Sequence, residues 1–145
     1  MGEDSMPVDV RSMTPLLEVF DMPTSLAFYR DLLGFEVVAR SGPDDNCDWV
    51  LLKLNNIHLM LNTAYEDDER PPAPDPARRN SHHDTALFFS CPDVDAAYRY
   101  LQERSVRAEP PNNAPYGMRQ LYFRDPDDFN ICFQWPVEET QTADH

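Results

Sequence analysis

The stretch V-F-D-M-P-T-S-L-A-F-Y-R-D-L-L-G-F, residues 19–35, joins the end of one predicted strand to a complete predicted helix. Its apolar start stops at Asp21-Met22-Pro23, which is typical of a strand followed by a turn. Thr24 or Ser25 can cap a helix there, and the apolar residues that follow recur at helical spacing. Gly34 stands where the C-terminus of a helix favours a positive φ. The stretch therefore predicts a strand, a helix and a sharp turn into a second strand.

Three further strands are predicted after this helix, and they complete the first half of the chain. They cover Phe35 to Val38, Trp49 to Leu54 and Ile57 to Leu61, and each is rich in apolar residues. The last two are separated by Asn55-Asn56, a pair that suits a tight hairpin. The first half is therefore predicted to contain one strand, one helix and three strands.

The second half repeats this order, which gives the chain a weak internal repeat of about 50 residues. Thr85 to Cys91 predicts a strand, Val94 to Glu103 a helix, and Val106 to Ala108 a short strand. The segment around Leu121 predicts the next strand, and Ile131 to Trp135 the last one. Two consecutive β-α-β-β-β modules indicate an α+β fold with mixed sheets.

Charged and proline-rich segments divide the chain. The segment from Tyr65 to Pro76 has no hydrophobic periodicity, which is typical of a linker and, less commonly, of a mobile lid. Pro110 to Pro115 predicts a second, shorter loop. We expect a flexible lead (1–12), a single domain (13–136) made of module one (13–63), a linker (64–83) and module two (84–136), and a tail (137–145).

The charge balance excludes several classes of partner. The chain has 145 residues, with 12 Lys and Arg against 26 Asp and Glu, and a net charge of −14. Nucleic-acid binding and docking on anionic lipid both need clustered basic residues, so we expect neither nucleic acid nor membrane as a partner. The four glycines are too far apart to form a glycine-rich phosphate loop.

The cysteines and the N-terminal residues indicate the compartment. Cys47, Cys91 and Cys132 are odd in number and lack a C-x-x-C spacing, which is typical of reduced thiols. The first residues do not form a basic signal sequence, and no apolar run reaches the roughly 18 residues that span a bilayer. We therefore expect a cytoplasmic protein.

Three motifs resemble the vicinal oxygen chelate superfamily, which includes glyoxalase I, extradiol dioxygenases and the fosfomycin- and bleomycin-resistance proteins. The first is the opening stretch, which the family writes V-x-D-x-x-x-S-x-x-F-Y-x-x-x-L-G-F. The others are Asp93 to Tyr98, and Tyr122 to Asp127 together with Asn130. Asp128 departs from the family's usual Gly, a change that a type I turn tolerates. The resemblance covers residues 14–136.

The resemblance implies both a fold and an assembly. In this family two β-α-β-β-β modules lie side by side and form a cup that encloses a small molecule. Similar short chains form symmetric dimers in which both subunits complete each cup, so we expect a homodimer. The motifs and the strand alternation predict a ligand-binding set of Glu18, Trp49, Lys53, His58, Met60, Phe88, Gln120, Tyr122 and Cys132.

Metal-dependent members of the family bind a divalent ion through His, Gln or Glu side chains on facing strands. The motifs place Thr14, Lys53, Ala86 and Cys132 at the corresponding positions. These side chains do not make a site for a hard or borderline cation, which favours carboxylate or imidazole ligands. We therefore expect neither a metal nor another cofactor, and we interpret Cys132 as a small buried apolar residue rather than a nucleophile.

The leading hypothesis is a small-molecule-binding protein of the glyoxalase/bleomycin-resistance type without the usual metal site. The alternative is an enzyme of the same superfamily, a lyase, isomerase or dioxygenase-like protein with a shifted metal site. That site would use His58, Asp84 and Glu18, with His58 or Glu18 as the base. A third hypothesis is a structural dimer without a ligand. His82 and His83 are expected to be solvated loop residues.

Overall fold

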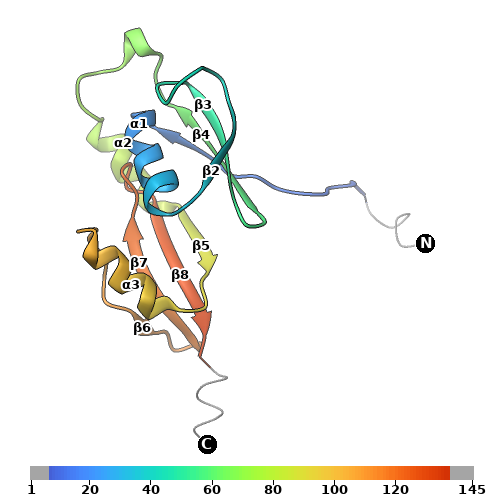
Figure 1. Ribbon diagram of the computed structural model, residues 1–145, viewed down its shortest axis with the longest axis vertical. Coiled ribbons are helices and arrows are strands. Elements are labelled where there is room, and N and C mark those ends of the chain that lie inside the picture. The colour runs from blue at the N-terminus through green and yellow to red at the C-terminus, as the bar shows by residue number, and fades with distance from the viewer. Residues whose placement is uncertain (1–6, 138–145) are drawn as a thin grey trace, which may run out of the picture. The chain divides into compact units, whose positions relative to one another are not determined.

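The computed structural model describes residues 7–137 (Figure 1). The first six residues of the predicted lead and residues 138–145 of the predicted tail lie outside the described residues. The described chain divides into two compact units between Glu69 and Arg70. Each unit contains one β-α-β-β-β module, so the predicted α+β class and the predicted order of elements are confirmed.

Module one contains a four-stranded mixed sheet. Its strands are β1 (Leu16–Val19), β2 (Glu36–Arg40), β3 (Trp49–Leu54) and β4 (Ile57–Thr63), arranged in the order β1-β4-β3-β2. β1 runs parallel to β4, and the other neighbours are antiparallel. The parallel pair requires a crossover, and the predicted helix between β1 and β2 supplies it.

The helix of module one starts one turn earlier than the sequence predicts. Asp21, rather than Thr24 or Ser25, caps α1 (Met22–Leu26), because its carboxylate accepts a hydrogen bond from the backbone N–H of Thr24. A wider π-helical turn, η2 (Ala27–Leu32), follows directly. Gly34 then adopts a φ of +94°, which confirms the predicted sharp exit from the helix.

The core of module one follows from the alternation of its strands. One face of the sheet is buried and lies against α1, while the other face stays open. The buried apolar side chains of β1, β3, β4 and the helical segment 22–32 are Leu17, Val19, Met22, Leu26, Tyr29, Val50, Leu52, Leu59 and Leu61.

Module two repeats this arrangement. Its strands are β5 (Ala86–Ser90), β6 (Asn112–Asn113), β7 (Met118–Arg124) and β8 (Asn130–Pro136), in the order β5-β8-β7-β6. The crossover helix α3 (Val94–Glu103) packs on one face, against β7 and β8. The opposite face carries no helix of this module (Figure 1).

The third strand of module two differs from the prediction. Val106 to Ala108 is not a continuous strand, since Ala108 makes only an isolated bridge to Phe123. β6 lies instead inside the predicted proline loop, where two Asn residues follow Pro110 and Pro111. Proline has no N–H to donate to a sheet, so it interrupts the pairing and splits it into two short pieces. We call residues 106–109 the strap.

The linker is more ordered than its composition predicts. It contains η3 (Asp67–Glu69), α2 (Pro76–Ser81) and the start of η4 (His82–Asp84). Asp75 caps α2 by accepting a hydrogen bond from the backbone N–H of Ala77 at 3.0 Å. Both histidines of η4 contact the turn between β7 and β8, and His83 is exposed as predicted, whereas the prediction of a solvated residue is wrong for His82, which is half-buried.

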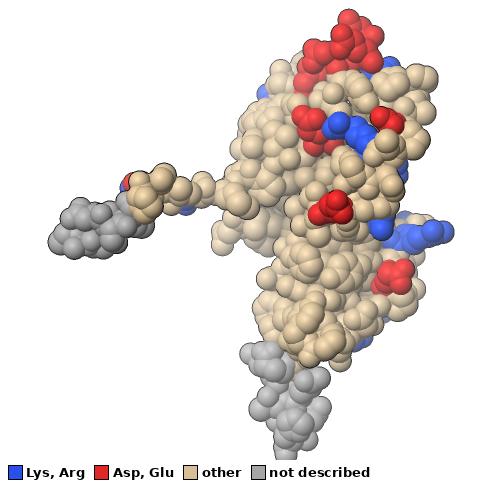
Figure 2. Space-filling model, turned by 180° about the vertical axis from the view of Figure 1, so that it is seen from behind, with Lys and Arg blue, Asp and Glu red and all other residues tan. Residues whose placement is uncertain are grey.

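The structure shows where part of the acidic charge lies and whether any helix could cross a membrane. Acidic side chains gather over η3, at one end of the view in Figure 2. Within residues 7–137, none of the helices has the length and apolar character needed to cross a membrane.

Candidate functional site

The open face of the sheet in module one carries five of the predicted ligand-binding residues, four of them on β3 and β4. The register pairs Lys53 with His58 directly, and it places Trp49 and Met60 on the same face of the neighbouring strands β3 and β4. Their strand neighbours with the opposite parity, such as Leu52, are buried on the helix side. The predicted facing of these side chains therefore agrees with the structure, while their contact with a ligand remains a prediction.

Glu18 lies on the same face but at a distance from His58. Glu18 pairs with Asn62 on β4, four residues along the strand from His58. At about 3.3 Å per residue this separation is about 13 Å, far beyond the span of two ligands of one metal ion. Asp84 lies in η4, before β5 begins, rather than on a strand face. The shifted metal site that combines Glu18 and His58 is therefore wrong.

The open face of module two brings three predicted residues into one row. Cys132 on β8 pairs with Phe88 on β5 and with Tyr122 on β7. The rings of Phe88 and Tyr122 meet edge to face, with centroids 6.1 Å apart and planes at 90°. Phe88 remains 52% exposed, whereas Cys132 is fully buried. The row is thus an apolar floor with an exposed aromatic ring at one side.

Burial keeps the polar groups of this row uncharged. It raises the pKa of the Cys132 thiol above its ordinary value, and the hydroxyl of Tyr122 opposes that rise only in part. Burial, followed by the nearby Cys132, also raises the pKa of Tyr122. Since a thiol with a raised pKa supplies little thiolate at neutral pH, this environment favours a packing role for Cys132 over a nucleophilic one.

A hydrogen-bonded group extends the floor along the same face. The Nε2 of Gln120 donates to the hydroxyl of Tyr116 and to the Oε1 of Gln134, both at 2.9 Å. Gln120 is only 4% exposed, so these bonds satisfy a buried amide. Tyr116 is 69% exposed and was not among the predicted residues. It lies in the turn between β6 and β7, outside any strand pattern, so the sequence carries no signal for a site there.

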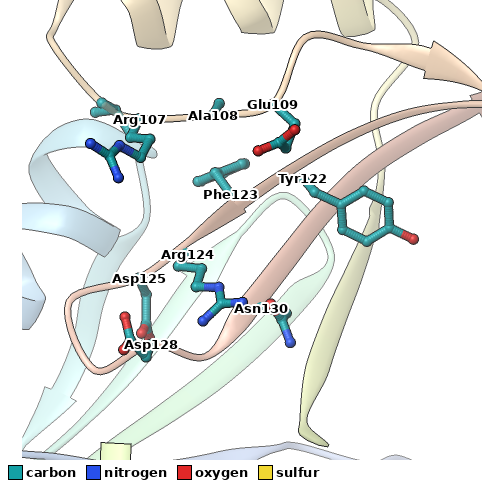
Figure 3. Close-up of a pocket in the computed structure, with 10 residues that line it drawn as sticks. Arg107, Ala108, Glu109, Tyr122, Phe123, Arg124, Asp125, Asp128 and Asn130 are labelled. Atoms are coloured by element: carbon teal, nitrogen blue, oxygen red, sulfur yellow. The ribbon is translucent and has the colours of Figure 1, made fainter. Parts of the chain in front are cut away.

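A pocket of about 640 Å³ opens beside Tyr122 (Figure 3). Arg107 and Glu109 reach into it from the strap, and Arg124 reaches into it from β7. Among the described residues, the side chains of Arg107 and Glu109 have no hydrogen-bond or ion-pair partner. The pocket lining is Val106, Arg107, Ala108, Glu109, Tyr122, Phe123, Arg124, Asp125, Asp128 and Asn130.

Most of the pocket was missed by sequence reasoning. The strap was predicted as an ordinary strand, and the residues of the turn from Asp125 onward were treated only as part of a motif. The pocket forms because the strap pairs with β7 at few points, including the N–H of Glu109, which donates to the carbonyl of Tyr122 at 3.1 Å. That irregular pairing depends on the tertiary fold, which local patterns do not report.

The residues at the family's metal positions do not fit a divalent ion. Thr14 offers only a neutral hydroxyl, Lys53 is a cation, Ala86 has no ligand atom, and burial raises the pKa of the Cys132 thiol. Between residues 7 and 137, no three His, Cys, Asp or Glu side chains gather closely enough to hold a metal ion. The donor set therefore disagrees with the metal centre that the resemblance implies for metal-dependent members.

Comparison with known sequences gives two matches of broad coverage. Residues 14–133 match the family described as "Glyoxalase/Bleomycin resistance protein/Dioxygenase superfamily". The protein YaeR of Escherichia coli (strain K12) is 31% identical over 110 residues, which cover 74% of this chain and 81% of YaeR.

Comparison with solved structures agrees with these sequence matches. TnmS3, an antibiotic binding protein from Streptomyces sp. CB03234, has a TM-score of 0.64 and 26% identity, covering 90% of this chain and 98% of TnmS3. Lactoylglutathione lyase from Agrobacterium tumefaciens has a TM-score of 0.64 and 20% identity, covering 88% and 94% of the two chains. At that lower identity the second likeness concerns the fold alone.

Proposed function

The chain belongs to the Glyoxalase/Bleomycin resistance protein/Dioxygenase superfamily, and from this membership we propose that it binds a small organic molecule without the usual metal site. The proposed contacts lie on the open faces of the two sheets. The ligand class is uncharged and aromatic or amphipathic. The superfamily alone does not define the ligand, because related folds serve many functions, so the proposal depends on the side chains of these faces.

The exposed ring of Phe88 is the observation that supports this proposal most strongly. A phenyl side chain that is 52% exposed leaves apolar surface in water, and covering that surface is favourable. The ring is held in one orientation by its edge-to-face contact with Tyr122. An aromatic ligand can therefore stack on a surface that is already ordered, at a small entropic cost.

The polar groups of this face suit an uncharged ligand with oxygen atoms. The raised pKa of Tyr122 keeps its hydroxyl neutral and able to donate a hydrogen bond. Because Nε2 of Gln120 donates to the hydroxyl of Tyr116, the proton of that hydroxyl is left to donate to a ligand. A few polar groups around an apolar floor are the usual makeup of a small-molecule site.

The comparison with TnmS3 supports the same class of function. That protein is described as antibiotic binding, and its identity and coverage exceed those of the lyase. By analogy, we propose binding rather than turnover as the function of this chain.

We further propose that the protein is a cytoplasmic homodimer. A second copy would enlarge each open sheet face into an enclosed site, which agrees with the incomplete cover of Phe88. The free thiols of Cys47, Cys91 and Cys132 are consistent with a reducing compartment. Light scattering after size exclusion measures the mass directly, and a monomer at micromolar concentration would contradict the dimer.

A binding screen tests the proposed function. The full chain is screened by thermal shift against uncharged planar aromatics, with flavone and 1-naphthol as the first probes, and positive compounds are measured by calorimetry. A saturable ligand raises the melting temperature in proportion to the logarithm of its concentration above Kd. The proposal is contradicted if uncharged aromatics never bind and a divalent metal binds stoichiometrically instead.

A further inference from the structure

The second part of the linker is attached to the turn between β7 and β8 by several directed contacts. Nη1 of Arg79 donates to the carbonyl of Pro126 at 2.5 Å, and its Nη2 lies 3.1 Å from the Oδ1 of Asp128. Nδ1 of His82 lies 2.7 Å from the carbonyl oxygen of Asp127. Three consecutive residues of the turn are therefore contacted by side chains of the linker.

The turn is a rigid surface for these contacts. Oδ1 of Asp125 accepts hydrogen bonds from the backbone N–H groups of Asp127 and Phe129, at 2.8 and 2.9 Å. The ring of His82 stacks on the buried ring of Phe129, with centroids 3.8 Å apart and planes at 11°. The linker thus gains apolar contact as well as hydrogen bonds from a turn that is fixed independently.

Asp128, which stands where the family usually has Gly, makes side-chain contacts that Gly could not make. Its φ of +69° corrects the expectation of an ordinary type I position, because this is the left-handed region that Gly adopts more easily. The carboxylate lies near the guanidinium of Arg79 and is 3.7 Å from Nε2 of His83. A side chain at a position that favours Gly therefore supplies the acidic contact for the linker.

The same segment contacts two residues that line the pocket. Nη1 of Arg124 donates to Nε2 of His83. The side chain of Asn130 donates to the backbone carbonyl of His83 at 2.8 Å. Both Arg124 and Asn130 line the pocket beside Tyr122. The orientation of these two side chains is therefore connected to the position of the linker.

We propose that Arg79, His82 and His83 form a latch that Asp128 holds closed, and that this latch orients Arg124 and Asn130 in the pocket. By orienting these two side chains, the latch sets the shape of the pocket beside Tyr122. The contacts of the latch stand by themselves, and only its effect on ligand binding rests on the proposed function. Motion of the linker is then confined to residues 64–75, while the segment from α2 onward moves with module two.

Limited trypsin digestion of the full chain tests the latch. Arg70 precedes a proline and resists trypsin, so the linker offers cleavage only after Arg78 and Arg79. These bonds should be protected in the native chain. Asp128→Asn and Asp128→Gly remove the ionic contact at a φ that both residues accept, and roughly tenfold faster cleavage is expected for each.

Asp84→Asn is the matched control, because Asp84 is an exposed acid of the same segment and lies outside the latch contacts. Its cleavage rate should equal that of the native chain, and circular dichroism should show that all variants remain folded. Cleavage after Glu66 and Glu69 by a Glu-specific protease should be the same in every variant. Equal trypsin rates for the Asp128 variants and Asp84→Asn would overturn the latch.

Chemical modification of arginine tests the connection to the pocket, whether or not a ligand is known. Phenylglyoxal modification of Arg124 is compared with that of Arg107, which has no described side-chain partner. His83→Ala and Asp128→Asn should raise the modification of Arg124 by several-fold relative to Arg107. An unchanged ratio in a variant that trypsin cleaves faster would overturn the orienting role of the latch.

Discussion

Phe88 and Tyr122 lie on either side of Cys132, and their rings meet edge to face at 6.1 Å across the middle of the open sheet face in module two. This pair combines a half-exposed aromatic surface with a fixed orientation. An aromatic ring in the core would be covered by other side chains, whereas Phe88 is half-exposed. Unlike an isolated ring on the surface, it also packs against a second ring, that of Tyr122. The pair therefore defines the proposed binding floor.

Loss of stability at high pH should depend on Cys132. The raised pKa means that the folded chain holds the thiol proton more tightly than the unfolded chain. Its contribution to stability is therefore complete below the ordinary thiol pKa of 9.0 and is lost as the pH rises above it. Cys132→Ser should reduce this alkaline loss, by at most about 1.4 kcal/mol per pH unit. Urea unfolding between pH 7 and 10 measures it, and parallel curves for both proteins would contradict the prediction.

The ion pair between Asp95 and Arg119 should stabilise module two by a small amount. Nη2 of Arg119 lies 2.7 Å from Oδ1 of Asp95, and this contact lowers the pKa of that carboxyl. Because both side chains are partly exposed, Asp95→Asn should cost only about 0.5–1 kcal/mol. The difference should disappear as the pH falls through the lowered pKa. Chemical unfolding at neutral and acid pH measures it, with Asp68→Asn on η3 as a control without effect.

Gly34→Ala should destabilise module one through its backbone alone. Gly34 has a φ of +94°, and an added Cβ would come no closer than 4.0 Å to Leu54. The expected cost is about 1–2 kcal/mol, which is the penalty of a left-handed conformation for a residue with a Cβ. Urea unfolding measures it. Gly117→Ala shares the positive φ and has open space, so a similar cost is expected there.

The metal content of the purified protein should be substoichiometric. The positions of the family's metal ligands hold Thr14, Lys53, Ala86 and Cys132, and these side chains do not suit a divalent cation. Plasma mass spectrometry on protein purified without chelators, after incubation with Zn²⁺, Ni²⁺, Mn²⁺ or Fe²⁺, measures it. One tightly held ion per chain, lost in His58→Ala, would sink this prediction.

Much of the fold could be predicted because its signals are local. The helical spacing after Asp21 and the glycine at position 34 specify the first crossover, and strand alternation specifies the faces of β3, β4 and β8. The position of β6 could not be predicted from local patterns. It depends on where the chain can pair with β7 once Pro110 and Pro111 have interrupted that pairing. The cap of α1 was misplaced because Asp21 was read only as a turn residue.

The candidate site was only partly predictable for the same reason. Parity alone places Phe88, Cys132 and Tyr122 on one face, and the register then makes them neighbours. The pocket residues Arg107 and Glu109 come from an irregular segment, and the latch joins His83 to a turn more than 40 residues away. Such contacts arise from tertiary packing, which leaves no periodic signal in the sequence.

Calorimetry with the Phe88→Ala variant tests the central claim most directly. The best uncharged aromatic from the screen is titrated into the native chain, the Phe88→Ala variant and the Ile57→Ala variant. Ile57 is the control because its exposed apolar side chain lies on the helix-covered face of the sheet in module one, away from both open faces. We predict that Phe88→Ala weakens binding about tenfold with little change in stability, and that Ile57→Ala binds as the native chain does. Equal affinity for all three proteins would contradict binding at this floor.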